Sequence, residues 1–239
     1  MKPRAEQCKE EGNRCMKEEK YTEAVIHYSE AVKHDPNSAV LHSNRSLAFL
    51  RLDQLYLAME DAQQAIKLEP NWPKGFYRKG EIEFKAGHYQ QALVSYKKAM
   101  IRDPNDSGIL SAISKTNKEM SKDKKDATRT PIIYTLIGLI VGVVIVLADQ
   151  FLTKKPAIQY LVLQVLLVAG CGGIGFIVAK IKRYITVSQR ESLLEEPLDL
   201  LKEMGEHGEE PKKQMSQNSN SHTHHSQAAG RQRMRKGKS

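Results

Sequence analysis

Small and apolar residues recur through the first 106 residues with a period of 34, and within each period they follow helical spacing. Pro36, Pro70 and Pro104 lie 34 residues apart, each where a helix must stop. The small residues with the same spacing are Ala24, Ala58 and Ala92; Ala31, Ala65 and Ala99; and Gly12, Ser46 and Gly80. Small residues at fixed positions let paired helices approach closely. The pattern therefore predicts three units of two helices each, at residues 5–38, 39–72 and 73–106.

The residues after the third unit continue a helical pattern before the chain becomes strongly basic. Ile109, Ile113 and Met120 share one apolar stripe. A stack of helix pairs needs a last helix whose outer face is polar. We therefore expect a capping helix at 107–125, followed by a basic linker at 126–131.

Two long uncharged runs follow this linker. The 17 residues at 132–148 would span about 26 Å as a helix, and the 23 residues at 157–179 about 34 Å. Uncharged runs of this length are rare inside small domains, so buried core helices are the weaker interpretation. The sequence predicts two transmembrane helices joined by a polar hinge at 149–156.

Lysine and arginine are distributed unevenly around the two runs. Six lie between residues 115 and 129 and four between 180 and 190, whereas the hinge has only Lys154 and Lys155. Because positive residues stay on the cytosolic side, both termini are expected in the cytosol. The apolar residues near the N-terminus follow the repeat pattern, so we expect no cleavable signal peptide.

Small residues inside the two runs indicate how helices could pair in the membrane. The first run has a GxxxG motif at Gly138 and Gly142. The second run has a cluster: Ala169, Gly172, Gly173 and Gly175. These residues permit close approach either within the chain or between two copies, so a homo-dimer through the transmembrane glycines stays open.

The residues after the second run are first basic and then polar. We expect a basic juxtamembrane segment with a short amphipathic helix within 180–205, beginning near Pro197 and ending before Gly205. Residues 206–239 are rich in Gln, Ser, Asn and His and predict a disordered basic tail, whose HTHH run is low-complexity sequence rather than a metal site. The closing RQRMRKGKS is similar to arginine-based retention signals, which favours the endoplasmic reticulum over the mitochondrial outer membrane.

Composition excludes several classes of function. The net charge of +9 invites nucleic-acid binding, but the excess basic residues flank the apolar runs and the tail, and aromatic residues are too few for a base-stacking surface. Cys8, Cys15 and Cys171 have no CxxC spacing, which indicates a reducing compartment without disulfides or a metal site. No catalytic constellation or phosphate-binding glycine loop occurs, so we expect neither an enzyme nor a cofactor. The uncharged runs also disfavour a channel or transporter.

The first helices of the three units bring cations and amides to one face. Lys9 and Asn13 are four residues apart, as are Lys74 and Arg78, so each pair shares a face of its helix. Asn44 lies 34 residues before Arg78 and takes the equivalent place in the second unit. Three cations and two amides along one concave groove would suit a short ligand with more than one carboxylate.

The repeat resembles the tetratricopeptide repeat over about the first 106 residues, although Cys8, His42 and Glu83 stand where that family often has aromatic residues. Within it KEEGN, SNRS and KGFYRKG are similar to the dicarboxylate clamp of co-chaperone tetratricopeptide domains. The resemblance implies an all-α fold of stacked helix-turn-helix repeats and a ligand, the C-termini of the cytosolic 70-kDa and 90-kDa heat-shock chaperones. The implied clamp residues are Lys9, Asn13, Asn44, Lys74 and Arg78. Lys79, beside Arg78, is expected to face solvent.

Two functions fit these features. A membrane-anchored co-chaperone adaptor would recruit heat-shock chaperones to an organelle surface for client folding, targeting or quality control. Alternatively, the repeats would form a scaffold subunit of a membrane complex with a non-chaperone partner. Blocking the carboxylates of a test peptide separates the two.

Overall fold

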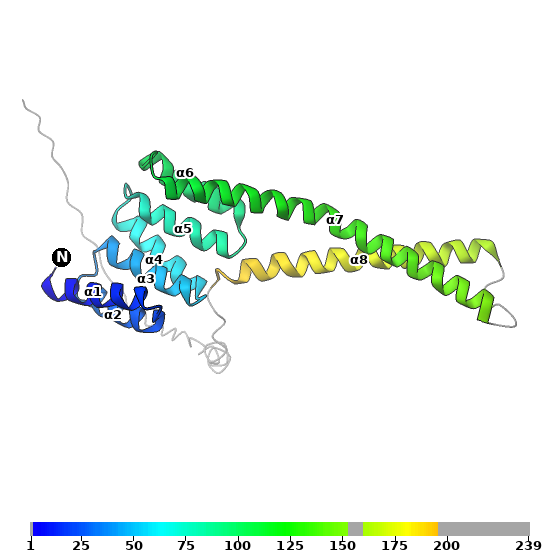
Figure 1. Ribbon diagram of the computed structural model, residues 1–239, viewed down its shortest axis with the longest axis horizontal. Coiled ribbons are helices and arrows are strands. Elements are labelled where there is room, and N and C mark those ends of the chain that lie inside the picture. Colours follow the sequence, from blue (N-terminus) through cyan, green and yellow to red (C-terminus); the bar gives the residue numbers. More distant parts are fainter. Residues whose placement is uncertain (1, 153–159, 196–239) are drawn as a thin grey trace, which may run out of the picture. The chain divides into compact units, whose positions relative to one another are not determined.

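The protein is described here by a computed structural model that covers residues 2–152 and 160–195, and every regular element in these ranges is an α-helix (Figure 1). The expected all-α class is therefore confirmed. The helices are α1 (Pro3–Lys17), α2 (Tyr21–His34), α3 (Ala39–Arg51), α4 (Leu55–Leu68), α5 (Pro73–Lys85), α6 (Tyr89–Arg102), α7 (Ser107–Leu152) and α8 (Leu161–Ser192).

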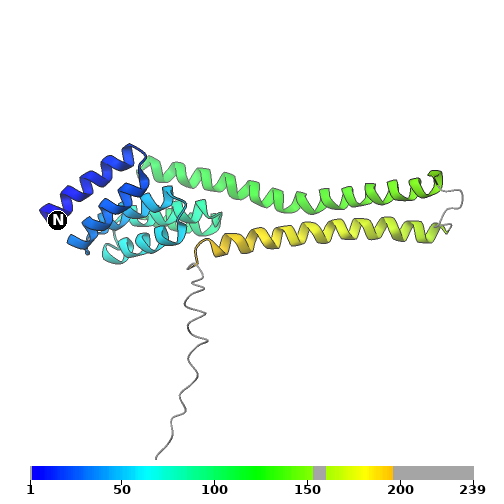
Figure 2. The ribbon, with the colours of Figure 1, turned by 90° about the horizontal axis from the view of Figure 1, so that it is seen from below.

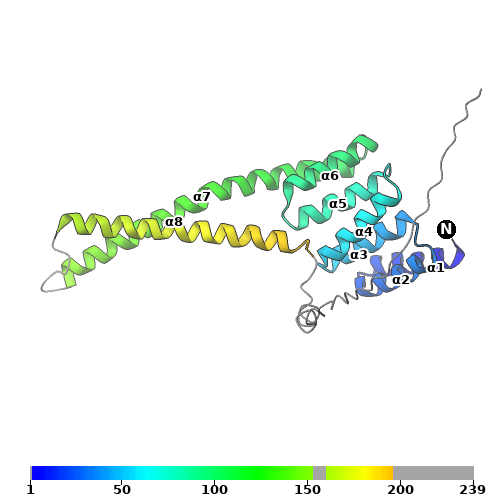
Figure 3. The same cartoon turned by 180° about the vertical axis from the view of Figure 1, so that it is seen from behind.

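The first six helices form three pairs that match the three predicted units. Helix α1 packs on α2, α3 on α4 and α5 on α6, and the second helix of each pair also contacts the first helix of the next (Figure 2). Helices α3 and α5 touch as well, so the first helices of the second and third units lie side by side. Helix α6 packs on the start of α7, which takes the position expected for a capping helix (Figure 3).

Close packing within the pairs explains why small residues recur at one position. A Cβ atom added at Gly12 would lie 2.6 Å from the ring of Tyr28, and one added at Gly80 would lie 2.7 Å from the ring of Tyr96. In the second unit the residue equivalent to these tyrosines is an alanine, and there Ser46 replaces glycine. The Ser46 hydroxyl is buried and donates a hydrogen bond to the carbonyl of Ala58 (2.7 Å). Glycine is thus required only where a tyrosine ring crosses it.

The turn inside each pair needs one residue with a left-handed backbone. These residues are Glu19 (φ 60°), Asp53 (φ 61°) and Gly87 (φ 80°), again 34 apart. Only glycine adopts this conformation without steric cost, so the first two turns carry backbone strain that the third avoids.

Polar residues that replace the usual aromatics are paired inside the fold. The ring nitrogens of His42 lie 3.0 Å from Oδ1 of Asp61 and 3.1 Å from the carbonyl oxygen of Pro36. Arg45 donates two hydrogen bonds of 2.7 Å to the same carboxylate, and Asp61 is almost fully buried. Buried polar groups destabilise a fold mainly when they lack hydrogen-bond partners, so His42 is accommodated at its buried position.

Glu83 is another polar residue at a position where the tetratricopeptide repeat often has an aromatic residue. Its side chain is buried and accepts a hydrogen bond of 2.5 Å from the Ser95 hydroxyl. Burial raises the pKa of Glu83 above its usual value of 4.5. The Lys79 Nζ lies 3.9 Å from the carboxylate.

The capping helix and the first apolar run are one continuous helix rather than separate elements. Helix α7 passes without a break through residues 126–131, where we expected a linker, and includes Pro131 in its interior. Lysine-rich sequence is compatible with helix, and a single proline removes only one intrahelical hydrogen bond. The hydroxyls of Thr130 and Thr135 donate to carbonyls one turn earlier (both 2.7 Å). Helix α8 likewise continues past residue 179 to Ser192.

Helices α7 and α8 lie side by side, and the transmembrane glycines are at their contact. A Cβ atom at Gly138 would lie 2.3 Å from the carbonyl oxygen of Cys171, and one at Gly175 would lie 2.2 Å from that of Tyr134. Gly142 and Gly172 are similarly close to the opposite helix. The GxxxG motif therefore pairs the two helices of one chain. A homo-dimer through the same glycines stays an untested expectation.

Both α7 and α8 are long and apolar enough to cross a membrane by length and composition. Only 6% of each most apolar stretch is buried in the protein, so nearly all of its residues are at least partly exposed. Apolar surface of this extent on a soluble protein would normally be covered. Residues 149–152 of the expected hinge are the last turn of α7. The other half of the hinge, the short helix near Pro197 and the tail at 206–239 lie outside the described residues.

Candidate functional site

A groove of ≈ 530 Å³ lies over the first helices of the second and third units and the start of α7. Three of the five predicted clamp residues line it, namely Asn44, Lys74 and Arg78. The other lining residues are Val40, Ser43, Trp72, Pro73, Tyr77, Asp103, Asp106, Gly108 and Ile109. The 34-residue period therefore places residues from different helices in one concave site.

Asn13 connects to this groove through a hydrogen bond to Asn44. The Asn44 amide nitrogen donates to the Asn13 side-chain oxygen at 3.3 Å, and the Tyr28 hydroxyl donates to the same oxygen at 2.7 Å. Burial raises the pKa of Tyr28 to about 12, so its hydroxyl keeps its proton at neutral pH. With its oxygen occupied twice, Asn13 presents its amide nitrogen as a donor.

Arg78 is the most constrained cation of the site. Its side chain is only 14% exposed, and one guanidinium nitrogen, Nη1, forms an ion pair with Glu81 one turn later on α5. The Nε atom of Arg78 is buried and has no hydrogen-bond partner among the described residues. An unsatisfied buried donor costs roughly 1–3 kcal/mol, so this guanidinium gains if it turns to meet a further acceptor.

Lys74 differs from Arg78 and Lys9, each of which is paired with a glutamate of its own helix. Lys74 is in the first turn of α5, is exposed, and has no ion pair among the residues that the structure describes. Lys9 lies one helical turn before Asn13, and its ammonium group pairs with Glu6 on the same helix. Lys9 does not line the groove. The structure thus brings four of the five predicted residues together, through contact or shared lining, and places the fifth one turn away.

Two acidic residues line the groove and were not expected there. The Asp106 carboxylate accepts hydrogen bonds from the backbone N–H groups of Gly108 (2.7 Å) and Ile109 (3.2 Å), so it caps the N-terminus of α7. Its negative charge is therefore partly offset by the helix end. Asp103 directly follows the last residue of α6 and also lines the groove. A carboxylate ligand would have to bind nearer to Lys74 and Arg78 than to Asp103.

Tyr77 lines both this groove and a second hollow of ≈ 590 Å³. The second hollow is more aromatic, with Phe84 and Tyr96 in its wall, and the rings of Tyr77 and Tyr96 lie 5.6 Å apart. Lys79 lines neither hollow and pairs with Glu83. The orienting role of Tyr28 was missed in the sequence, although Tyr28 and Tyr96 stand two periods apart and could have suggested it.

Comparison with known proteins agrees with this arrangement. The family model for the TPR repeat matches residues 12–53. The solved Sgt2 TPR domain from Aspergillus fumigatus superimposes with a TM-score of 0.50 at 25% identity, covering 52% of this chain and 83% of that one. The first six helices thus form three helix pairs with the tetratricopeptide-repeat fold.

This tetratricopeptide domain is similar in sequence to parts of larger proteins. Hsp70-Hsp90 organizing protein 3 of Arabidopsis thaliana is 37% identical over 118 residues, which are 49% of this chain and 21% of that protein. Hsp70-Hsp90 organising protein of Plasmodium falciparum is 40% identical over 118 residues, 49% of this chain and 47% of that protein. The match thus spans less than half of either relative. Neither name is that of an enzyme.

Proposed function

We propose that the chain is a membrane-anchored co-chaperone adaptor that binds the C-terminal carboxylates of cytosolic 70-kDa or 90-kDa heat-shock chaperones. The observation that carries this proposal is that Asn44, Lys74 and Arg78 line one groove and Asn13 is hydrogen-bonded to Asn44. The buried Nε of Arg78 also lacks a hydrogen-bond partner among the described residues. The similarity to Hsp70-Hsp90 organizing proteins supports the choice of ligand.

The chemistry of a chain end suits these four residues. A terminal aspartate offers two carboxylates close together, one from the main chain and one from the side chain. The two asparagine amides donate to them without adding charge, and Lys74 and Arg78 supply charge-assisted hydrogen bonds worth roughly 1.5–3 kcal/mol each. Lys9, one turn before Asn13 on α1, would also bind the ligand once its ammonium group leaves the Glu6 carboxylate. Residues upstream in the peptide would continue toward Tyr77 and the second hollow.

The second part of the proposal is that α7 and α8 anchor this domain in a membrane. Their outward apolar side chains need a cover, and basic residues gather where both helices leave the apolar stretches. Both termini would then face the cytosol, where the chaperones are. Because α7 runs without a break from the groove at Ile109 into the apolar stretch that begins at Ile132, roughly 35 Å of helix would separate the site from the membrane surface. The endoplasmic reticulum is favoured by the closing RQRMRKGKS.

Calorimetric titration of the full chain in detergent with a Met-Glu-Glu-Val-Asp peptide tests the ligand. We expect a dissociation constant on the order of micromolar, about −8 kcal/mol, and almost no heat with the same peptide amidated at its C-terminus. Equal binding of the amidated peptide would exclude the clamp and leave a tetratricopeptide scaffold with a non-chaperone partner. Resistance of the expressed chain to alkaline extraction from membranes tests the anchor separately.

A further inference from the structure

A third hollow, distinct from the two beside Tyr77, lies between α7 and α8, where both helices leave their apolar stretches. Its volume is ≈ 390 Å³. Pro131 on α7 and Ala179 on α8 line it, and these two residues border the uncharged runs 132–148 and 157–179. If the helices span a bilayer, the hollow lies at the depth of the lipid headgroups on the side of the tetratricopeptide domain.

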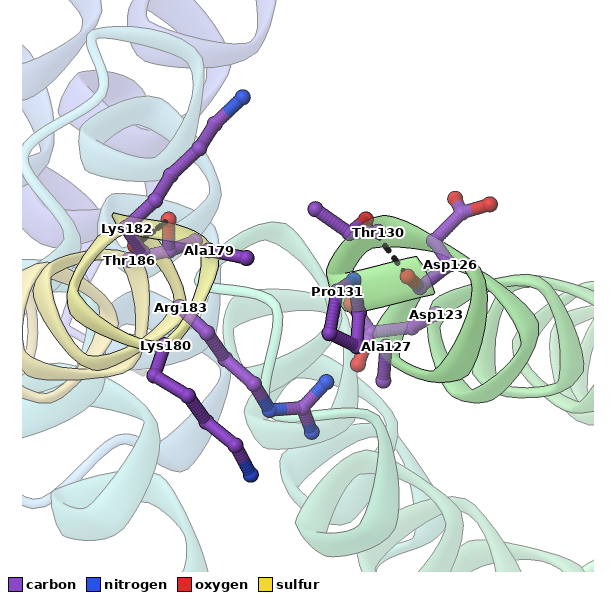
Figure 4. A pocket seen from close by; sticks show the side chains of 10 residues that line it. All are labelled: Asp123, Asp126, Ala127, Thr130, Pro131, Ala179, Lys180, Lys182, Arg183 and Thr186. Carbon is purple, nitrogen blue, oxygen red and sulfur yellow. Dashed lines mark hydrogen bonds between the residues drawn. The ribbon is translucent and has the colours of Figure 1, made fainter. Parts of the chain in front are cut away.

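The side chains of α8 make this hollow basic. Lys180, Lys182 and Arg183 all line it. Figure 4 shows Arg183 reaching from α8 toward α7, with Lys180 beside it, whereas Lys182 points in a different direction. Lys182 is also engaged elsewhere, because its Nζ lies 3.3 Å from the Tyr134 hydroxyl. Two cations therefore remain directed at the space between the helices.

The acidic residues of the wall do not neutralise these two cations. Asp123 accepts a hydrogen bond of 2.8 Å from Arg190, so its charge is already paired. The carboxylate of Asp126 points out of the gap (Figure 4). Neither Lys180 nor Arg183 has an ion pair among residues 2–152 and 160–195. Lys180 lies over the ring of Phe176, 5.5 Å from its centroid.

Apolar side chains continue from this hollow along both helices. Ile132 and Ile133 are 56% and 52% exposed on α7, and Ile177 is 56% exposed on α8. A ligand with an anionic head and apolar tails would match a basic hollow that borders such surfaces. Basic pockets between transmembrane helices on the cytoplasmic side are suited to lipid phosphates.

We propose that Lys180 and Arg183, in the hollow between α7 and α8, bind the phosphate headgroup of an anionic phospholipid. The inference rests on the proposed membrane anchor but not on the carboxylate clamp. Arg183 would grip phosphate oxygens with its planar fork, and Lys180 would add a second charge-assisted contact. The acyl chains would lie against the exposed isoleucines. The lipid would thereby fix the ends of the two helices at the membrane surface.

Native mass spectrometry of the full chain, with phosphatidylinositol phosphate or phosphatidylserine added, tests this site. The double variant Lys180→Gln/Arg183→Gln is compared with Lys125→Gln/Arg129→Gln. The control pair removes the same residue types from the exposed juxtamembrane part of α7, outside the hollow. We expect the first pair to weaken binding of phosphatidylinositol phosphate by about tenfold or more, and the control pair by much less.

Three results would overturn the inference. Equal weakening by both double variants would mean general attraction of anionic lipid to basic residues. Unchanged binding in Lys180→Gln/Arg183→Gln would exclude these two residues. Full competition by inositol phosphate without acyl chains would mean that the ligand is a soluble phosphate rather than a lipid. Alkaline extraction of each variant shows independently whether the anchor is intact, so failure of the anchor is not mistaken for failure of the site.

Discussion

Removing the guanidinium of Arg78 should weaken binding of the chaperone peptide far more than removing a neighbouring cation. Arg78 is 14% exposed, so a carboxylate that meets it there is largely shielded from water. Charge-assisted hydrogen bonds contribute roughly 1.5–3 kcal/mol. The Arg78→Ala variant should therefore lose about 2–3 kcal/mol of binding free energy, a weakening of about 30- to 150-fold. Titration calorimetry with the Met-Glu-Glu-Val-Asp peptide measures this loss.

The matched control is Lys79→Ala, because Lys79 is the next residue of α5 but lines neither hollow. Its removal should change the dissociation constant by no more than about twofold, as expected for a surface charge. Arg78→Lys should lie between the two, because lysine keeps the charge and loses the planar fork. Equal weakening by Arg78→Ala and Lys79→Ala would refute the reasoning, since binding would then depend on general charge.

Three further variants test the parts of the structure that support the site, with unfolding followed through Trp72, the single tryptophan. Tyr28→Phe removes the hydrogen bond that orients Asn13 and should weaken peptide binding about fivefold in calorimetry. Asp61→Ala leaves a half-buried guanidinium unpaired and should lower the free energy of unfolding in urea by about 3 kcal/mol. Burial raises the pKa of Glu83, so the folded state holds this proton more tightly and stability should fall as pH rises above the unfolded value of 4.5. Glu83→Gln should remove this slope in urea titrations at several pH values, and an unchanged slope would assign it to another group.

The structure could be predicted best in the first 106 residues, where the sequence repeats every 34 residues. Proline, alanine and glycine recur every 34 residues because each unit makes the same helix contacts, so pairs and groove could be predicted without coordinates. The same period gave Asn44 the place in the second unit that Arg78 has in the third, and both line the groove. Position in a repeat, however, does not say what each side chain already contacts. The Glu6 partner of Lys9 and the Glu81 partner of Arg78 are such contacts.

The remaining differences have local causes that composition does not reveal. Pro131 and the charged residues before it suggested a linker, but helical sequence on both sides carries α7 through them. The glycines of the GxxxG motif indicated close approach without naming the partner helix, and the structure places α8 against them. Asp106 lies in the groove because the turn before α7 brings it there. Asp103 follows the repeat period after Asp35 and Glu69, but the period alone does not say that it lines the groove.

Co-flotation of a chaperone with vesicles tests the central claim most directly, because it requires both the anchor and the clamp. The full chain is reconstituted into liposomes and mixed with the 90-kDa chaperone, either intact or lacking its terminal aspartate. The account predicts that intact chaperone floats with the vesicles and that the truncated chaperone stays at the bottom of the gradient. Intact chaperone should also stay at the bottom when the vesicles carry the Lys74→Ala/Arg78→Ala variant. Equal flotation of intact and truncated chaperone would contradict the account.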